Sequence, residues 1–421
     1  MAIEPADVRD EYLPRLEENL TENVLDFWFP RSIDEEYGGF ITSYDAEGEF
    51  AGTDHKQIVT QARMVWLASR LAREGFGEEY LDIAEQGYEF LVEEMWDDEH
   101  GGFVWEVAPD GTTTKPNRHL YGQSFGLYSL SEYARVTGED EPAELAFELV
   151  DLLESEAKDE QYGGYVEYFE PDWTPITEGR TYLEAIEPDW SPKESGDAVL
   201  DPTLKLMNTH LHLMEAFTTY YDVFGTDLGR ERLQELLTIN TNTVVRKRLG
   251  ACTDKYEPDW TPKLDAEEFR IVSYGHDLEM VWLAAAACDS LGLAPSLFVD
   301  LFETLWDYSL EYGYDDEDGG VYFYGGFEEP ASFRIKAWWV QAEALTSAIK
   351  TYRLTGDSRY LDVFTALWDF IEEYQVDDVH GEWHSGVDED GSPLGRKGAV
   401  YKAAYHNGRA LIESIAELKQ L

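Results

Sequence analysis

The chain has 421 residues, of which 43% are hydrophobic and 14% aromatic, so it can bury a large core and is not a disordered protein. Its 87 acidic and 32 basic residues give a formal charge of −55, and the absence of a basic patch argues against a nucleic-acid-binding protein. The two cysteines, Cys252 and Cys288, are too few for a disulfide scaffold or a zinc cluster.

So large a net charge destabilises a compact chain by self-repulsion unless salt screens it. At molar salt the screening length falls to about 3 Å, so we expect a cytoplasmic protein of a salt-accumulating halophile. The N-terminal residues contain neither a basic nor an apolar stretch, and we expect no signal peptide. No apolar run approaches the ~20 residues that a membrane span requires, so we expect no membrane association.

Glycine-containing turns recur at a regular spacing along the chain. They read YGGF (37–40), HGGF (100–103), YGGY (162–165), RLGA (248–251), DGGV (318–321) and HGEW (380–383). A second series of glycines follows helical segments, at Gly75, Gly138, Gly225, Gly292 and Gly356. Each of these lies 25 to 27 residues before the next turn; from Gly75 to Gly101, for instance, is 26 residues. A glycine just past the last apolar position is the usual left-handed helix cap.

The segments between the glycines are amphipathic helices. Tyr80, Ala84, Tyr88, Leu91 and Met95, for example, recur at helical spacing. Every second helix, beginning near residues 60, 120, 204, 273, 336 and 403, carries polar and aromatic residues where an open solenoid would have plain apolar packing. The pattern therefore predicts an all-α (α/α)6 barrel, in which six helical hairpins with short β-hairpin loops at one end form a single domain, residues 1–421.

One repeat is longer than the others, with an excess of 25 residues that falls in 170–195. This insertion contains EPDWTP and EPDWSP, and a further EPDWTP occupies residues 257–262. Such acidic, proline-rich segments are typical of loops. We interpret them as a cover over one end of the barrel with buried tryptophans, in preference to direct substrate contacts.

Each predicted inner helix carries polar residues at same-face spacing. The set comprises Arg63, Trp66, Tyr121, Gln123, Asn208, His212, His276, Glu279, Trp338, Trp339, Gln341, Glu343, His406 and Arg409. A single histidine on an apolar helix is more often a hydrogen-bonded core residue than a catalyst. Six helices that all point polar groups inward are different, because burying these groups without water or a ligand is costly. The set indicates a wet, functional cavity.

Three kinds of site compete for these residues. A metal site could use His212, His276, Glu279 and His406, but the paired spacings of zinc proteases and di-iron bundles are absent from the sequence. A glycoside hydrolase would need two carboxylates across the cavity, and Glu215, Glu279 and Glu343 are available. Histidines, however, outnumber the obvious inward carboxylates, and histidine transfers protons in both directions near neutral pH.

Four segments resemble the N-acylglucosamine 2-epimerase superfamily, in particular its cellobiose 2-epimerase and mannose isomerase branch. They are NTHLHLMEAF, GHDLEMVWLA, WWVQAEAL and YHNGRAL, on four different helices. The resemblance implies that His276 and His406 are the catalytic acid–base pair and that Glu279 orients His276. It also implies that Arg63, Tyr121, Asn208 and His212 bind the sugar and that Trp338 and Trp339 form a stacking wall. His210 must point elsewhere on its helix, and we expect it to be structural.

The same residues suit proton transfer at the carbon beside a sugar carbonyl. Two histidines on opposite walls can remove and return this proton on the two faces of an enediolate, while Arg63 stabilises its negative oxygen. We therefore expect a sugar isomerase or 2-epimerase that needs no metal and no organic cofactor. Its partner would be a small-molecule sugar, and the protein would be a monomer or a homodimer.

The substrate is less clearly encoded than the reaction. Cellobiose epimerases typically have a tryptophan five residues before the last catalytic histidine, where this chain has Tyr401. A tyrosine offers less stacking surface, which argues against a disaccharide, and the GHD and WWVQAE segments argue against the N-acylated sugars. We expect a monosaccharide of the mannose, glucose and fructose set. A cellobiose-type disaccharide 2-epimerase, a barrel-fold glycoside hydrolase and a non-catalytic sugar-binding protein are the alternatives.

Overall fold

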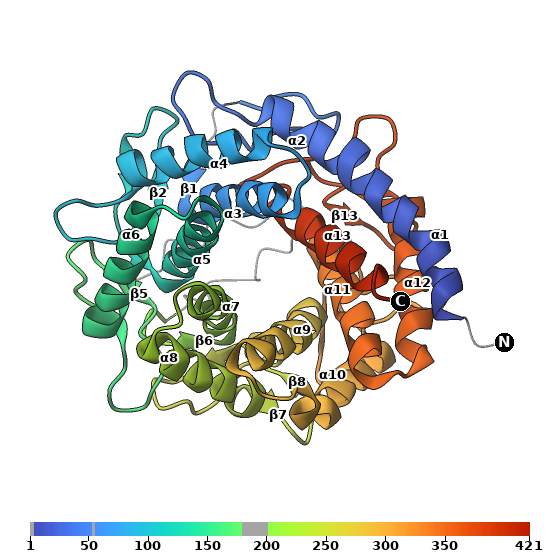
Figure 1. Cartoon of the computed structure of the whole chain (residues 1–421). Coiled ribbons are helices and arrows are strands. Elements are labelled where there is room, and N and C mark those ends of the chain that lie inside the picture. Colours follow the sequence, from blue (N-terminus) through green and yellow to red (C-terminus); the bar gives the residue numbers. More distant parts are fainter. Residues whose placement is uncertain (1–3, 53–54, 179–200) are drawn as a thin grey trace.

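The computed structural model describes residues 4–52, 55–178 and 201–421, and it consists of two concentric rings of helices (Figure 1). The inner ring contains α3 (Ile58–Glu74), α5 (Leu120–Thr137), α7 (Met207–Phe224), α9 (Tyr274–Leu291), α11 (Trp338–Thr355) and α13 (Tyr405–Leu418). Each inner helix packs against the next, and α13 packs back against α3. This closed ring confirms the predicted (α/α)6 barrel.

The outer ring is formed by the helices that precede or follow each inner helix in the chain. It contains α1 (Pro5–Glu18), α2 (Asp26–Arg31), α4 (Glu79–Phe90), α6 (Asp140–Leu152), α8 (Asp227–Thr238), α10 (Val299–Tyr312) and α12 (Ser358–Phe370). Short π-helical turns join or extend these helices at η1 (Asn19–Leu25), η2 (Leu91–Met95), η3 (Leu153–Ala157), η5 (Ile239–Thr243) and η8 (Ile371–Gln375), and 3-10 turns form η6 (Glu267–Phe269) and η7 (Pro295–Phe298). The first helix, α1, covers α13, so the first and last helices lie side by side (Figure 1).

The glycines determine where the inner helices end, as the sequence predicted. Gly75, Gly138, Gly225, Gly292 and Gly356 are the C-caps of α3, α5, α7, α9 and α11, all in the left-handed conformation. A side chain is disfavoured in this conformation, which explains why glycine recurs there. Within the described residues no helix is long and apolar enough to cross a membrane.

Short strands lie at the end of the barrel where the inner helices begin. They are β1 (Lys56–Gln57), β2 (Glu106–Val107), β3 (Thr113–Lys115), β4 (Arg118–His119), β5 (Tyr168–Phe169), β6 (Lys205–Leu206), β7 (Val245–Arg246), β8 (Ala251–Cys252), β9 (Lys255–Tyr256), β10 (Ile271–Ser273), β11 (Tyr324–Gly326), β12 (Lys336–Ala337), β13 (Gly386–Val387) and β14 (Pro393–Leu394). The pairs β2–β3, β7–β8 and β13–β14 are local hairpins. The pairs β1–β2, β4–β5, β6–β9, β10–β11 and β12–β13 instead connect successive repeats.

Two glutamines that we expected inside the cavity are instead anchors for the glycine turns. The side-chain amide of Gln123 donates to the carbonyl of Phe103 at 2.8 Å and accepts from its N–H at 2.9 Å. Gln341 binds the backbone of Val321 in the same way, at 2.7 and 2.8 Å. Both glutamines are the fourth residue of an inner helix. A side chain at this position points to the glycine turn that follows the preceding outer helix. The expectation that they face the cavity was wrong.

His210 occupies the same fourth position in α7 and has the structural role expected for it. Its Nε2 accepts the backbone N–H of Tyr165 at 3.1 Å, and its Nδ1 lies 2.7 Å from the carbonyl oxygen of Leu206. Both ring nitrogens are thereby used within the protein.

Buried lysines connect the glycine turns to the starts of the inner helices. The aspartate that opens a turn forms an ion pair with a buried lysine, which lies two residues before an inner helix in three cases and in the loop before α13 in the fourth. The pairs are Lys56–Asp34 at 2.7 Å, Lys205–Asp159 at 2.6 Å, Lys336–Asp315 at 2.7 Å and Lys397–Asp377 at 2.7 Å. These contacts hold the N-terminal ends of the inner helices in place.

Two of the EPDW segments are described, and both fold back on a glycine turn. The indole N–H of Trp173 donates to the carbonyl of Gly101 at 3.2 Å, and that of Trp260 donates to the carbonyl of Gly163 at 3.1 Å. Trp173 is buried and Trp260 half-buried against these turns. Their role as a cover over the barrel end stays a prediction. The second copy, at 187–192, lies outside the described residues.

Candidate active site

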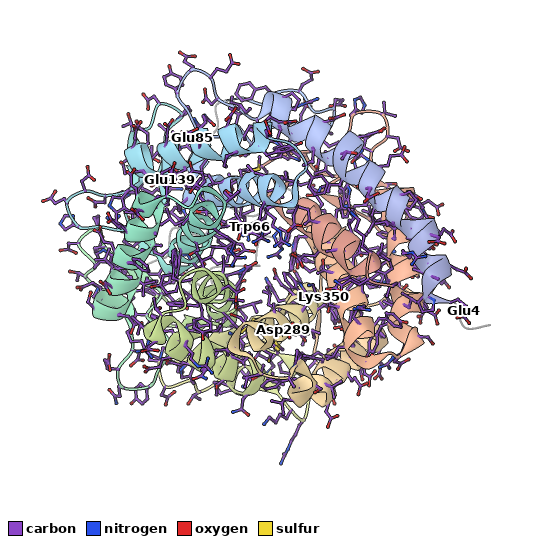
Figure 2. The ribbon with its side chains drawn as sticks, viewed as in Figure 1. Glu4, Trp66, Glu85, Glu139, Asp289 and Lys350 are labelled. Carbon is purple, nitrogen blue, oxygen red and sulfur yellow. The ribbon has the colours of Figure 1, made fainter. Side chains whose placement is uncertain are left out.

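The residues predicted to form the site gather at one end of the barrel interior. Except for Trp66 and Tyr401, all of them lie within the first six residues of an inner helix. Figure 2 shows how densely side chains fill the inner ring, whereas acidic residues such as Glu85 and Glu139 lie on the outer rim. The closed ring therefore brings together residues that are up to 343 positions apart, from Arg63 to His406.

Two of the histidines form short contacts with buried carboxylates. Nδ1 of His406 lies 2.6 Å from Oε1 of Glu343, which belongs to the neighbouring helix α11. Nδ1 of His212 lies 2.8 Å from Oε2 of Glu215, one turn further along α7. In each pair the carboxylate accepts the Nδ1 proton, so Nε2 is left as the basic nitrogen.

Arg409 connects the carboxylates of three inner helices. Its guanidinium donates to Glu279 at 2.8 Å, to Glu343 at 2.7 Å and, by a shorter contact, to Glu215. Arg409 is fully buried, and its planar fork of five donors suits this bridging role. The sequence placed Arg409 on the inward face, but nothing in its spacing from His406 revealed that it holds three glutamates.

The hydrogen-bond partners of Glu279 differ from those that we expected. Glu279 was expected to orient His276, three residues earlier on the same helix. Instead its Oε1 accepts from Arg409, and its Oε2 lies 3.9 Å from Nε2 of His212. Burial, together with the nearby Glu343 carboxylate, raises the pKa of Glu279 well above its usual range, although Arg409 opposes this effect. No described residue donates to Oε2 of Glu279, which is left available to a ligand.

His276 contacts an aromatic ring and makes no hydrogen bond to any described residue. Its imidazole lies 4.7 Å from the ring of Trp339, measured between centroids, at an angle of 40°. Burial lowers the pKa of His276 to about 4, although the carboxylate of Asp254 acts in the opposite direction. His276 is therefore neutral near pH 7 and can accept a proton.

His406 lies beside the same tryptophan. Its ring centroid is 5.9 Å from that of Trp339. Burial lowers the pKa of His406 well below its usual range, and the positive charges of Arg63 and Arg409 lower it further. The two histidines come from α9 and α13, which both pack against α11, and the rings of both approach Trp339 on that helix. That they serve opposite faces of one substrate stays a prediction.

The two tryptophans of the expected stacking wall differ in exposure, although the rings of both lie close to that of His406, at 6.3 Å for Trp338 and 5.9 Å for Trp339. Trp339 is partly exposed and contacts both histidines. Trp338 is buried in the core, where the ammonium of Lys402 lies 5.3 Å from its ring. Tyr401 lies in the loop before α13, half-buried against the core.

The remaining predicted residues offer polar groups to the same region. Arg63 donates to the hydroxyl of Tyr121 at 2.9 Å, and its guanidinium lies 4.1 Å from the ring of Phe125. Burial raises the pKa of Tyr121, so its hydroxyl stays protonated. The Nε of Arg63 and the side-chain oxygen of Asn208 are buried without a hydrogen-bond partner among the described residues. A bound polar molecule would satisfy both.

One group of side chains has the composition of a metal site. Potential ligand atoms of Glu279, Glu343 and His406 lie within 4.8 Å of one another. The guanidinium of Arg409 already donates to both glutamates, so a divalent cation would have to compete with this fixed positive charge. His276, which we weighed as a metal ligand, is not part of this group.

Fold and site together define an (α/α)6 barrel whose interior holds buried histidines, carboxylates and arginines. Sequence comparison matches residues 39–187 and 178–410 to the N-acylglucosamine 2-epimerase (GlcNAc 2-epimerase) family, and the chain belongs to this family. The resemblance inferred from the four sequence segments is thereby confirmed.

Several relatives extend over nearly the whole chain. The chain is 30% identical over 413 residues to the cellobiose 2-epimerase of Bacteroides fragilis, which covers 97% of this chain and 100% of the relative. It is 23% identical to the D-mannose isomerase of Marinomonas mediterranea, covering 94% and 95% of the two chains. The solved cellobiose 2-epimerase of Spirochaeta thermophila matches with a TM-score of 0.85 at 30% identity, covering 98% of each chain.

Proposed function

We propose that this protein is a cofactor-independent sugar 2-epimerase or aldose–ketose isomerase. The observation that carries the proposal is the pair of histidines, half-buried His276 and buried His406, whose rings lie 4.7 and 5.9 Å from the ring of Trp339. Family membership supports the same class of reaction. Burial lowers the pKa of both imidazoles, so both are ready to act as bases at neutral pH.

The reaction begins with the open-chain aldose. One imidazole takes the proton from C2, the electron pair of that bond forms the C1–C2 double bond, and the C1 carbonyl becomes an enediolate oxygen. Return of a proton to the other face of C2 yields the C2 epimer. Delivery of a proton to C1, with transfer of the C2 hydroxyl proton to the C1 oxygen, yields the ketose with its carbonyl at C2. Two proton-transfer groups beside one planar intermediate are sufficient for both outcomes.

His406 has the more firmly defined orientation of the two. Its Nδ1 proton is held by Glu343, which in turn accepts from Arg409 and, at 2.9 Å, from the indole N–H of Trp282. Nε2 of His406 is therefore the reacting nitrogen. His276 has no such partner among the described residues, and contact with the sugar or with Trp339 would fix its orientation.

The polar groups around the histidines suit the sugar and its developing charge. Arg63 supplies a positive charge for the enediolate oxygen, and oriented donors of this kind stabilise such a charge most effectively in a buried site. Asn208 and Tyr121 suit the sugar hydroxyls. Glu279, with its raised pKa, can donate its proton to a sugar oxygen. His212, held by Glu215, completes this set.

Two substrates follow from different observations. Tyr401, in place of the expected tryptophan, supports a monosaccharide of the mannose, glucose and fructose set. The 30% identity to cellobiose 2-epimerases, against 23% to a D-mannose isomerase, favours cellobiose as the second candidate. Both substrates have the same reacting carbon, so the proposed chemistry is unchanged.

The glycoside hydrolase alternative has weaker support. A hydrolase needs two carboxylates that flank the scissile bond, about 5–9.5 Å apart. Here Glu215, Glu279 and Glu343 all share the guanidinium of Arg409. A non-catalytic sugar-binding site would not need two basic histidines beside the same aromatic ring.

We further propose that residues 1–421 form one catalytic domain that acts in the cytoplasm as a monomer or homodimer. The inner ring closes only when α13 meets α3, which supports a single unit. The excess of acidic residues supports a salt-rich cell interior.

The decisive experiment follows the C2 proton. The protein is incubated in heavy water at high KCl with mannose, glucose, fructose and cellobiose in turn, and the products are followed by NMR. Deuterium at C2 of an epimer or ketose is the expected result and identifies the substrate. If no sugar of the panel is converted, while the protein is folded by circular dichroism, the proposal is wrong.

A further inference from the structure

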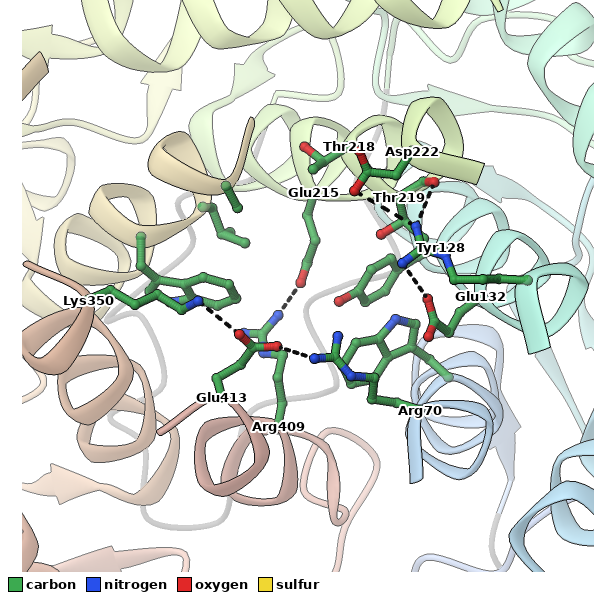
Figure 3. A pocket seen from close by; sticks show the side chains of 15 residues that line it. Arg70, Tyr128, Glu132, Glu215, Thr218, Thr219, Asp222, Lys350, Arg409 and Glu413 are labelled. Atoms are coloured by element: carbon green, nitrogen blue, oxygen red, sulfur yellow. Dashed lines mark hydrogen bonds and ion pairs between the residues drawn. The ribbon is translucent and has the colours of Figure 1, made fainter. Parts of the chain in front are cut away.

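A second cavity lies in the barrel interior, beyond the candidate active site. It has a volume of about 200 Å³ and is lined by later turns of the inner helices, such as Arg70, Tyr128, Thr219 and Lys350 (Figure 3). Glu215 and Arg409 line it as well, and the bond between them is part of its floor. These two residues also touch the proposed active site, through His212 and Glu343, so the cavity begins where that site ends.

The charges around this cavity are balanced and paired. Its lining contains four basic residues, Arg70, Arg135, Lys350 and Arg409, and four acidic ones, Glu132, Glu215, Asp222 and Glu413. Glu413 accepts from Arg70 at 3.0 Å and from Lys350 at 2.8 Å. Neither a free anion nor a free cation would find an uncompensated charge here, so the lining favours a neutral ligand.

Some hydrogen-bonding capacity in the lining is unused. The indole N–H of Trp66 is buried and donates to no described residue. Arg135 lies 3.6 Å from Glu132 and 3.8 Å from Asp222, which is too long for hydrogen bonds, and it only just reaches the backbone carbonyl of Thr219, at 3.5 Å. These donors and the carboxylates beside them can serve a molecule whose groups both donate and accept.

Aromatic residues complete the cavity lining. The indole of Trp66 stacks on Tyr128 with centroids 4.8 Å apart, and Trp282 lies in the lining as well. Trp66 and Tyr128 cover one face of each other's ring, and the guanidinium of Arg409 lies 4.7 Å from the ring of Trp282, so these residues offer the cavity little ring surface besides the indole N–H of Trp66. Hydroxyl groups of a ligand can bond to the carboxylates and guanidinium groups of the lining. Pockets for drug-sized ligands have volumes of roughly 300–1,000 Å³, so this one suits a single small molecule.

We propose that this cavity is a second, non-catalytic binding site for a small neutral polyhydroxy molecule, a monosaccharide or a polyol. The proposal stands on the cavity lining and is independent of the proposed reaction. A ligand there would contact Glu215 and Arg409, which also bond to His212 and Glu343 of the candidate active site.

The test uses a single reactive thiol in the cavity. Thr219→Cys places a thiol at a half-exposed position of the lining, and Thr238→Cys, on the exposed face of α8, is the matched control. The two native cysteines are buried. The rate of modification by a small uncharged thiol reagent is measured with increasing D-mannitol, which has no carbonyl group and cannot be epimerised.

D-Mannitol should slow the modification of Thr219→Cys by the factor 1 + [L]/Kd and leave Thr238→Cys unchanged. Calorimetric titration with D-mannitol gives a second readout. Ala286→Phe adds volume inside the cavity and should abolish binding of D-mannitol there. His406→Asn, which leaves the cavity unchanged, should retain this binding. Equal modification rates with and without D-mannitol would overturn the proposal. Protection by potassium chloride in place of D-mannitol would overturn the assigned ligand class.

Discussion

Nδ1 of His406 and Oε1 of Glu343 lie 2.6 Å apart, although the two residues belong to different inner helices. The contact fixes which nitrogen of the imidazole carries the proton, and Arg409 holds the carboxylate from its other side at 2.7 Å. Catalysis by His406 should therefore depend on Glu343 more than on Glu279.

The fall of the reaction rate at acidic pH tests the protonation states of His276 and His406. Because burial lowers the pKa of His276 to about 4 and that of His406 well below 6.5, both stay neutral as the pH falls through 6.5. We therefore expect kcat/KM to be unchanged through pH 6.5, the ordinary histidine value, and to fall only as the pH approaches about 4, where His276 gains a proton. Buried neutral histidines also favour the folded state above pH 6.5 and lose this contribution as the pH falls, so circular dichroism must accompany each point.

Glu343→Gln and Glu279→Gln form a matched pair for the same profile. Glu343→Gln should lower kcat and displace the acidic limb of the pH–rate profile, because it removes the negative carboxylate next to Nδ1 of His406. Glu279→Gln should have the smaller effect, since a carboxyl group with so high a pKa already resembles a neutral amide. A larger shift from Glu279→Gln would instead support the pairing with His276 that the sequence suggested.

Replacing either histidine by asparagine should abolish epimerisation and leave sugar binding nearly intact. Loss of a general acid or base typically costs ~10²–10⁴-fold in rate. Turnover is measured by NMR and affinity by calorimetry. One of the variants should still exchange the C2 proton with heavy water from a single face, without inversion. Near-normal turnover in both variants would refute the catalytic assignment.

Arg409→Met should destabilise the protein strongly. The change leaves three buried glutamates without their shared cation, and breaking a buried ion pair in this way costs about 3–5 kcal/mol. The control is Arg9→Met, whose partner Asp10 is on the surface, where an ion pair contributes about 0–1 kcal/mol. Denaturant unfolding at constant KCl measures both. Equal midpoints would show that Arg409 does not hold the site together.

Chelation should leave activity unchanged. Glu279 and Glu343 are the carboxylates best placed for a metal with His406, but Arg409 already neutralises both. Turnover is measured after exhaustive dialysis against EDTA, with untreated protein as the reference. Activity that disappears and returns with one divalent metal would refute the proposed mechanism.

Salt should raise the thermal stability. The acidic side chains that give the chain its formal charge of −55 repel one another most strongly at low ionic strength. Between 0.1 and 2 M KCl the screening length falls from ~10 Å to below ~3 Å, so the unfolding midpoint should rise. The midpoint is followed by circular dichroism, with NaCl as a second salt. A midpoint that does not change would contradict the halophile hypothesis.

The sequence by itself determined the repeated helical pattern and the place of the barrel's polar interior. Helical periodicity and glycine caps depend on contacts between residues close in the chain, so spacing alone could locate Gly75, Gly138 and the other ends of the inner helices. The same local information predicted that Arg63, His276 and His406 face the interior.

Only the tertiary structure decided which side chains bond to one another. His276 and Glu279 are three residues apart and looked like partners, yet Glu279 binds Arg409 from another helix. Gln123 and Gln341 looked like cavity residues, yet they bind the backbone of the glycine turns that follow outer helices. Spacing along one helix shows which face of the helix a side chain lies on. The packing of neighbouring helices determines which charged group of another helix lies within 3 Å of that side chain.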